Sequence, residues 1–142
     1  MGKIRKILVG VDGSGTSYRA AEVALDLANA LNAQVTAVYV IPSLPADYSR
    51  FFDLSALEVN EEEVERKIMH EVRIMAISKG VKLETKILRG RPSDIIVSLA
   101  EEGDYDLIVL GNTGLGSAYR RAMGSIVSEV IISTRKPILL VK

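Results

Sequence analysis

The fold is decided by the stretch Leu107-Ile108-Val109-Leu110-Gly111-Asn112-Thr113-Gly114, which is followed after a spacer of nine residues by Gly124-Ser125. Its first four residues are continuously apolar, as expected for a strand that is covered on both faces of a parallel sheet. Glycines leave this strand, and Gly-Ser opens a helical pattern over 126–132. Backbone N–H groups approach an anion closely where no Cβ intervenes, and a helix N-terminus adds unpaired donors and positive potential. The stretch therefore predicts a strand, a phosphate-binding loop and a helix in succession.

Strand and helix patterns alternate along all 142 residues. The predicted strands cover 7–11, 35–40, 81–88, 106–110 and 138–141. The predicted helices run from a cap at Ser14 or Ser17 to residue 31, over 61–79 with Gly80 as the stop, from Pro92 to Gly103, and over 125–133. Strands separated by helices favour parallel pairing with right-handed crossovers. The sequence therefore predicts a single α/β domain over 1–142, with a doubly wound five-stranded parallel sheet and helices on both faces.

Periodicity also predicts which parts of these elements are buried. The helix over 61–79 places Val64, Ile68, Val72 and Met75 on one face, which we expect to lie against the core. The strand over 81–88 is more polar and alternating than the others, which indicates an edge position.

The two most glycine-rich segments follow the first and fourth predicted strands. They are Gly10-Val11-Asp12-Gly13-Ser14 and Gly111-Asn112-Thr113-Gly114. In doubly wound sheets, ligands lie beyond the carboxyl ends of the strands, where the strand order reverses. We therefore expect both segments to meet at one ligand site, although periodicity alone leaves the strand order open.

Composition excludes several classes of protein. Eighteen basic residues balance eighteen acidic ones, so no global field recruits nucleic acid or an anionic membrane. The chain has no cysteine, which excludes disulfides, thiolate chemistry and cysteine-ligated metals. The apolar run that follows the basic N-terminal residues is too short for a signal peptide. No apolar stretch approaches the roughly 20 residues that a bilayer span needs. We therefore expect a cytoplasmic protein.

The motifs resemble those of the universal stress protein family over nearly the whole chain. The spacing Gly-x2-Gly-x9-Gly-Ser from Gly111 to Ser125 resembles the nucleotide-binding pattern of that family, and the first-strand motif over 7–14 is typical of it. The segments 89–96, 100–111 and 136–141 are similar to further family motifs. The resemblance implies the strand order 3-2-1-4-5 and a homodimer. It also implies ATP binding, because family members that keep the glycine pattern bind ATP.

At matching positions the resemblance implies a nucleotide site formed by Gly10, Asp12, Val40, Gly111, Asn112, Thr113, Gly114, Gly116, Gly124, Ser125 and Ile126. The loop 111–114 would wrap the ribose and phosphates, and residues 124–126 would present N–H groups to the phosphates. Asp12 would lie near the ribose or a phosphate-bound metal such as Mg, since protein side chains alone provide no metal site. Val40 would meet the adenine through its backbone.

Simpler interpretations of these residues stay open. Short glycine spacings also occur in ordinary turns. Asp12 also fits a turn or a helix start, and Ser125 also fits an N-cap, which does not exclude a phosphate contact. The single histidine, His70, lies in a charged segment and is interpreted as a surface residue, not a catalyst.

Three classes of function compete. The first, which we favour, is an ATP-binding signalling or stress-response protein with little intrinsic hydrolysis. The second is a slow or partner-activated ATPase, or a nucleotidyl transferase, on the same fold. The chain has no Walker lysine loop and no obvious general base, so fast catalysis is not expected. The third, a receiver-like phosphorelay domain, fails because the third strand ends in Leu88-Arg89-Gly90 without a phosphoacceptor Asp. The sequence names no protein partner and does not distinguish ATP from AMP.

Two further expectations concern surfaces. The apolar strand over 137–141 ends the sequence with an uncovered edge, which predicts a homodimer through that strand. The segment 42–60 contains Tyr48, Phe51 and Phe52, which fit either an interaction loop or a cover for the sheet edge.

Overall fold

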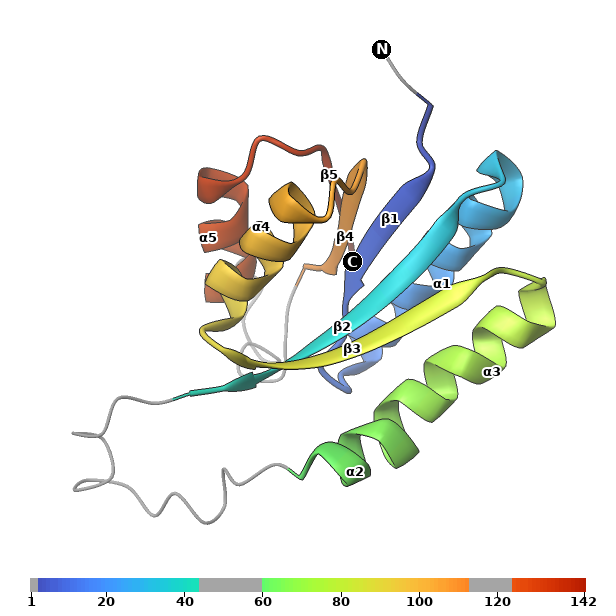
Figure 1. Cartoon of the computed structure of the whole chain (residues 1–142), viewed down its shortest axis with the longest axis horizontal. Coiled ribbons are helices and arrows are strands. Elements are labelled where there is room, and N and C mark those ends of the chain that lie inside the picture. The colour runs from blue at the N-terminus through green and yellow to red at the C-terminus, as the bar shows by residue number, and fades with distance from the viewer. Residues whose placement is uncertain (1–2, 44–59, 113–123) are drawn as a thin grey trace.

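All five strands join one parallel sheet in the order β3-β2-β1-β4-β5. The structure, a computed structural model, describes residues 3–43, 60–112 and 124–142 (Figure 1). The strands are β1 (Lys6–Gly10), β2 (Gln34–Pro42), β3 (Leu83–Gly90), β4 (Leu107–Gly111) and β5 (Ile138–Val141). This arrangement confirms the predicted fold and strand order, and it places β3 at an edge, as its alternating pattern indicated.

The helices cover both faces of the sheet (Figure 1). They are α1 (Gly15–Leu31), α2 (Glu61–Val64), η3 (Glu65–Met69), α3 (His70–Lys79), α4 (Pro92–Glu102) and α5 (Ser125–Ser133). Ser14 caps α1 by accepting a hydrogen bond from the Ser17 N–H at 3.1 Å, and Gly80 ends α3 with a φ of 67°. In the described ranges, no helix combines the length and the apolarity that a bilayer span requires.

The sheet separates two hydrophobic cores. Ile7 and Val9 of β1 are fully buried against α1 and α3, whereas Leu8 between them is fully buried against α4 and α5. Successive strand residues point to opposite faces, so a strand buried on both faces must be apolar at every position. This requirement explains the continuous apolar runs from which the strands were predicted.

A π-helical turn, η3, interrupts the helix predicted over 61–79. The buried residues of this helix are Val64, Met69, Val72 and Ala76, and the predicted residues Ile68 and Met75 are half-buried and pack against the same core. A π turn takes more residues per turn than an α turn. It therefore brings Met69, five residues after Val64, to the core side next to Ile68, while Val72 faces the core as predicted.

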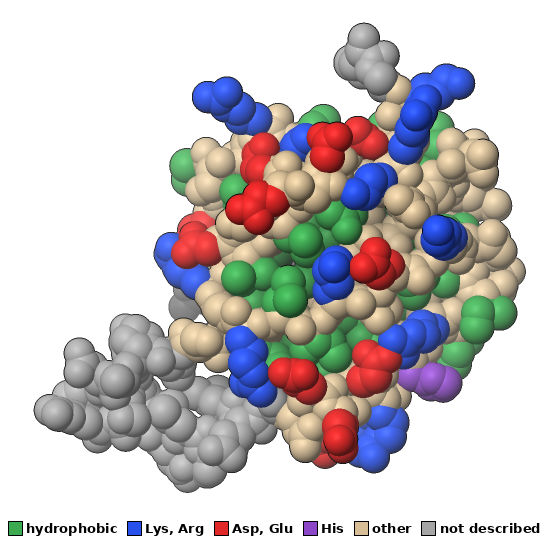
Figure 2. Space-filling view, in the orientation of Figure 1, with side chains coloured by type: hydrophobic (Ala, Val, Ile, Leu, Met, Phe, Trp, Pro, Cys, Tyr) green, Lys and Arg blue, Asp and Glu red, His purple; other side chains and the backbone are tan. Residues whose placement is uncertain are grey.

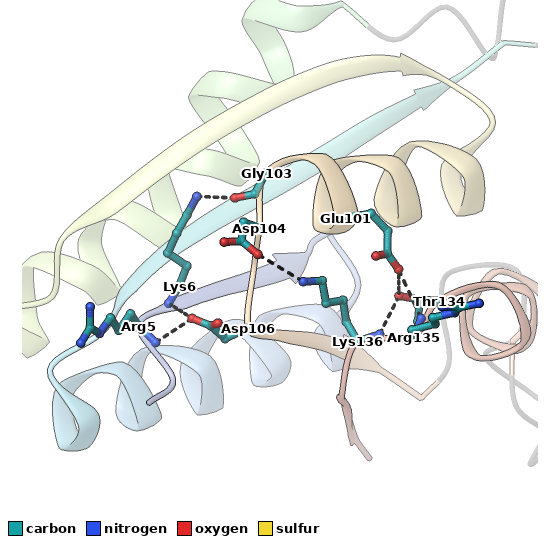
Figure 3. A network of polar contacts seen from close by, with 9 residues as sticks. All are labelled: Arg5, Lys6, Glu101, Gly103, Asp104, Asp106, Thr134, Arg135 and Lys136. Carbon is teal, nitrogen blue, oxygen red and sulfur yellow. Dashed lines mark hydrogen bonds and ion pairs between the residues drawn. The ribbon is translucent and has the colours of Figure 1, made fainter. Parts of the chain in front are cut away.

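A polar network ties the elements together at the amino ends of the strands, opposite the end at which a ligand is expected (Figure 3). The Asp106 carboxylate accepts hydrogen bonds from the N–H groups of Arg5 at 2.9 Å and Lys6 at 3.0 Å. The pKa of Asp106 is lowered, mainly by the hydrogen bond from the Arg5 N–H. The charged carboxylate of Asp106 therefore holds the start of β1 beside the start of β4.

Candidate functional site

A cavity of about 390 Å³ opens at the carboxyl ends of β1, β2 and β4, beside the first turns of α4 and α5. It lies where the strand order reverses around β1, which is the expected ligand position in a doubly wound sheet. Of the predicted nucleotide-binding residues, those that line the cavity are Gly10, Asp12, Val40, Gly111, Gly124, Ser125 and Ile126. The fold thus brings Gly10 and Asp12 of the first glycine-rich segment and Gly111 of the second to one cavity.

One wall of the cavity is the N-terminus of α5. Gly124 is its N-cap residue, and no side chain of the described residues caps this end. The first donor within the helix is Ser128, whose N–H donates to the Gly124 carbonyl at 3.0 Å. The N–H groups of residues 125–127 come before this first donor and have no acceptor within the helix, as at any helix start. They give this wall donors and the positive end of a helix dipole.

Two details of this wall differ from the sequence interpretation. The Gly124 N–H, which the resemblance assigns to the phosphates, donates to the Asn112 carbonyl at 3.1 Å and is engaged within the chain in this conformation. Ser125 is the first residue of the helix and not its N-cap, because Gly124 has the extended cap conformation. The donors of this wall therefore begin at Ser125.

Asn112 supports the wall without lining the cavity. Its N–H donates to the Val141 carbonyl at 2.7 Å, while its own carbonyl accepts from Gly124. It therefore joins the end of β5 to the start of α5 through its backbone. Thr113, Gly114 and Gly116, which complete the predicted loop, lie outside the described residues, as does most of the segment 42–60.

Asp12 lies at the cavity and also holds a turn. One carboxylate oxygen accepts the Ser14 N–H at 2.8 Å, and the Asp12 N–H donates to the Ser17 hydroxyl at 3.2 Å. That turn uses only one of the two carboxylate oxygens. The turn interpretation and a ligand role are therefore compatible. Burial, and after it the Asp12 charge, raises the pKa of Tyr39, which also lines the cavity.

The second wall is apolar, and the sequence interpretation missed most of it. Val38, Leu110, Ile96 and Val127 line the cavity and belong to the core between the sheet, α4 and α5. Pro92 at the start of α4 adds to this wall. The available signal was strand alternation, because Val38, Val40 and Leu110 share the face of the sheet that α4 and α5 cover. A planar apolar group fits such a wall.

Gly111 has a packing role in addition to its place at the cavity. A Cβ built on Gly111 would lie 2.9 Å from Thr16 Cγ2, 3.0 Å from the Thr16 carbonyl carbon and 3.1 Å from its oxygen. The absence of a side chain therefore lets the first turn of α1 approach the end of β4. The sequence interpretation assigned this glycine to the ligand alone.

Comparisons with known proteins agree with this architecture. The model of the universal stress protein family matches residues 3–142. A universal stress protein of Methanocaldococcus jannaschii is 37% identical over 143 aligned positions, which cover 97% of this chain and 82% of that protein. The structure of the universal stress protein UspA from Lactobacillus plantarum is 27% identical, with a TM-score of 0.83 and full coverage of both chains.

Two further solved structures are complexes with adenine nucleotides. One is a universal stress protein in complex with cAMP, 28% identical, with a TM-score of 0.70 and coverage of 99% and 98% of the two chains. The other is the universal stress protein from Archaeoglobus fulgidus in complex with dAMP, 26% identical, with a TM-score of 0.69 and coverage of 97% and 98%. From its sequence motifs, its strand order and these matches, the chain belongs to the universal stress protein family.

Proposed function

We propose that this chain binds an adenine nucleotide, ATP first among them, and acts as a nucleotide-dependent signalling or stress-response protein with little intrinsic hydrolysis. The observation that carries the proposal is one cavity with two unlike walls. The apolar wall over Val38, Ile96 and Leu110 suits a planar base, and the first turn of α5 suits an anion. The cAMP and dAMP complexes of related proteins support the adenine class.

The proposed site assigns a task to each segment. Val40 lies at the carboxyl end of β2, where its backbone would meet the adenine, and Ser125 and Ile126 would donate to the phosphates. Asp12 would lie near the ribose or a Mg²⁺ carried by the phosphates, with the carboxylate oxygen that the Ser14 turn does not use. An oxygen ligand of this kind fits Mg²⁺, which usually binds through one or two carboxylates and the phosphates themselves.

The ligand can be identified directly. We expect an adenine nucleotide to be retained by the purified protein and to be released when it is denatured. Mass spectrometry of the released fraction distinguishes ATP from AMP, cAMP and other nucleotides. A chain that releases no nucleotide and binds none of these by calorimetry would contradict the proposal.

Hydrolysis of ATP by the isolated protein should remain near the background rate. In the described lining of the cavity the titratable side chains are Asp12 and Tyr39. The single histidine, His70, lies exposed on α3 (purple in Figure 2). Phosphoryl transfer needs a group that positions or activates the attacking water. A phosphate-release assay tests the prediction. Sustained turnover of about 1 s⁻¹ or more, lost in Asp12→Ala, would favour the alternative of an ATPase.

We also propose a homodimer through β5. This strand is last in the sheet order, so its outer edge has no strand partner among the described residues. The carbonyl of Pro137 accepts from Ile108 of β4, and that of Val141 accepts from Asn112, which follows β4. The alternation of the ladder therefore places the N–H of Leu140 on the outer edge. Such an edge pairs readily with a second copy, and two-fold dimers are the commonest assembly.

Light scattering tests the dimer. We expect twice the chain mass at micromolar concentration, and a single species of 15.4 kDa would refute the dimer. Leu140→Pro should yield monomers, because it removes an outward N–H and leaves the ladder to β4 intact. Unchanged circular dichroism would show that the variant folds. A dimer that survives this change would place the interface elsewhere.

A further inference from the structure

The helices α4 and α5, which carry two parts of the cavity, are joined by side-chain contacts at both ends. Near the cavity, Glu129 of α5 accepts a hydrogen bond from the Ser93 hydroxyl at 2.5 Å and pairs with the Arg91 guanidinium at 2.9 Å. At the other end, Glu101 of α4 accepts from the Thr134 hydroxyl at 3.0 Å and the Arg135 N–H at 3.2 Å (Figure 3). Ser93 and Glu101 are about 12 Å apart along the helix.

The contact near the cavity is the better fixed of the two. Ser93 is only 3% exposed, so its hydroxyl needs a partner within the protein, and Glu129 supplies a charged acceptor. The Arg91 pair lies at the surface, where an ion pair contributes little by itself. The Ser93 bond therefore ties the first turn of α4 to the second turn of α5.

Both residues are neighbours of cavity residues. Ser93 follows Pro92, which lines the cavity. Glu129 follows Ser125 by four positions, so Ser125 and Glu129 lie on one face of α5. Pro92 and Ile96 contribute to the apolar wall, and Ser125 and Ile126 contribute the donors. A change in the spacing of α4 and α5 would thus shift one wall against the other.

We propose that Glu129 is a positioning residue of the nucleotide site, acting through Ser93 to hold the apolar wall in register with the phosphate-binding turn of α5; this rests on the proposed function. Glu129 also carries a negative charge in the first half of α5. If Glu129 acted only through its charge, its removal would strengthen the binding of an anionic ligand. If Glu129 positions the two walls, its removal weakens that binding, so the sign of the change in affinity separates the two roles.

The test compares Glu129→Ala with Glu101→Ala, which removes the corresponding contact at the far end of the same two helices. With ATP as the probe, calorimetry should show binding weakened about tenfold in Glu129→Ala and unchanged in Glu101→Ala. Glu129→Gln should recover most of the loss, because its amide oxygen still accepts the Ser93 hydroxyl. Unchanged or tighter binding in Glu129→Ala, or equal losses in the two alanine variants, would overturn the proposal. A glutamine variant as weak as the alanine one would overturn the role of Ser93.

Hydrogen exchange gives a readout that needs no ligand. The amides of residues 128–130, which make the first hydrogen bonds of α5, should exchange faster in Glu129→Ala than in Glu101→Ala and the parent. Equal exchange in all three proteins would overturn the positioning role even if ATP binds. A parent protein that binds no adenine nucleotide would instead refute the proposed function, while the exchange rates would still decide whether Glu129 holds the two helices.

Discussion

ATP at about 100 times its dissociation constant should raise the free energy of unfolding by about 2.7 kcal/mol. The gain should vanish in Gly124→Val. The reason is that Gly124 is buried, lines the cavity and directly precedes the donors of α5, where branched carbons would take the space of a phosphate. Thermal and denaturant unfolding with and without ATP measure both effects.

The Gly124→Val variant is a sharp test because its backbone suits valine. Gly124 has a φ of −64° and a ψ of 152°, an extended conformation open to any residue, and its N–H can still donate to the Asn112 carbonyl. Loss of the ATP response is therefore expected without loss of the fold, which circular dichroism checks. Gly15→Ala, at an exposed position outside the cavity lining, should retain the full response. A full response in folded Gly124→Val would mean that the nucleotide binds elsewhere.

Gly111→Ala should destabilise the protein by about 1–3 kcal/mol, the range of overpacked sites. The added Cβ would press on the Thr16 carbonyl group, and backbone atoms cannot rotate aside as a side-chain end can. Relief would require α1 to move away from β4 and would open the core around Val9 and Val109. Chemical denaturation without ligand measures the loss.

Gly15→Ala is the matched control for Gly111→Ala. A Cβ at Gly15 meets no atom within 4 Å, and the residue is the first of α1. Alanine there restricts the unfolded chain, so stability should be unchanged or higher by about 0.4–1 kcal/mol. Equal destabilisation by both substitutions would show that the contact with Thr16 does not limit Gly111.

The elements were predictable because local rules act strongly in this chain. The apolar runs over 7–9 and 107–110 are typical of strands that are buried on both faces. Pro92, Gly80 and Gly103 mark helix boundaries because each restricts or frees the backbone in a specific way. The strand order came from the family resemblance, because periodicity contains no information about which strands pair.

The features that sequence patterns did not predict depend on tertiary contacts. The π turn at 65–69 leaves no local signal, so the full burial of Met69 next to the half-buried Ile68 could not be foreseen. The bond between the Gly124 N–H and the Asn112 carbonyl depends on how two loops meet. The contact of Glu129 with Ser93 joins residues 36 positions apart, and neither belongs to the glycine pattern.

The central place of β1 has a consequence for how the chain folds. Its neighbours are β2, which is the next strand along the chain, and β4, whose approach joins Arg5 to Asp106 across 101 positions. Until residues of β4 are available, one edge of β1 is bare and the core beneath Leu8 is incomplete. Closing so long a loop costs entropy before its contacts repay it, which slows folding. During synthesis, the first half of the sheet therefore waits for the second, and its fully apolar strand is most exposed to misassociation in that interval.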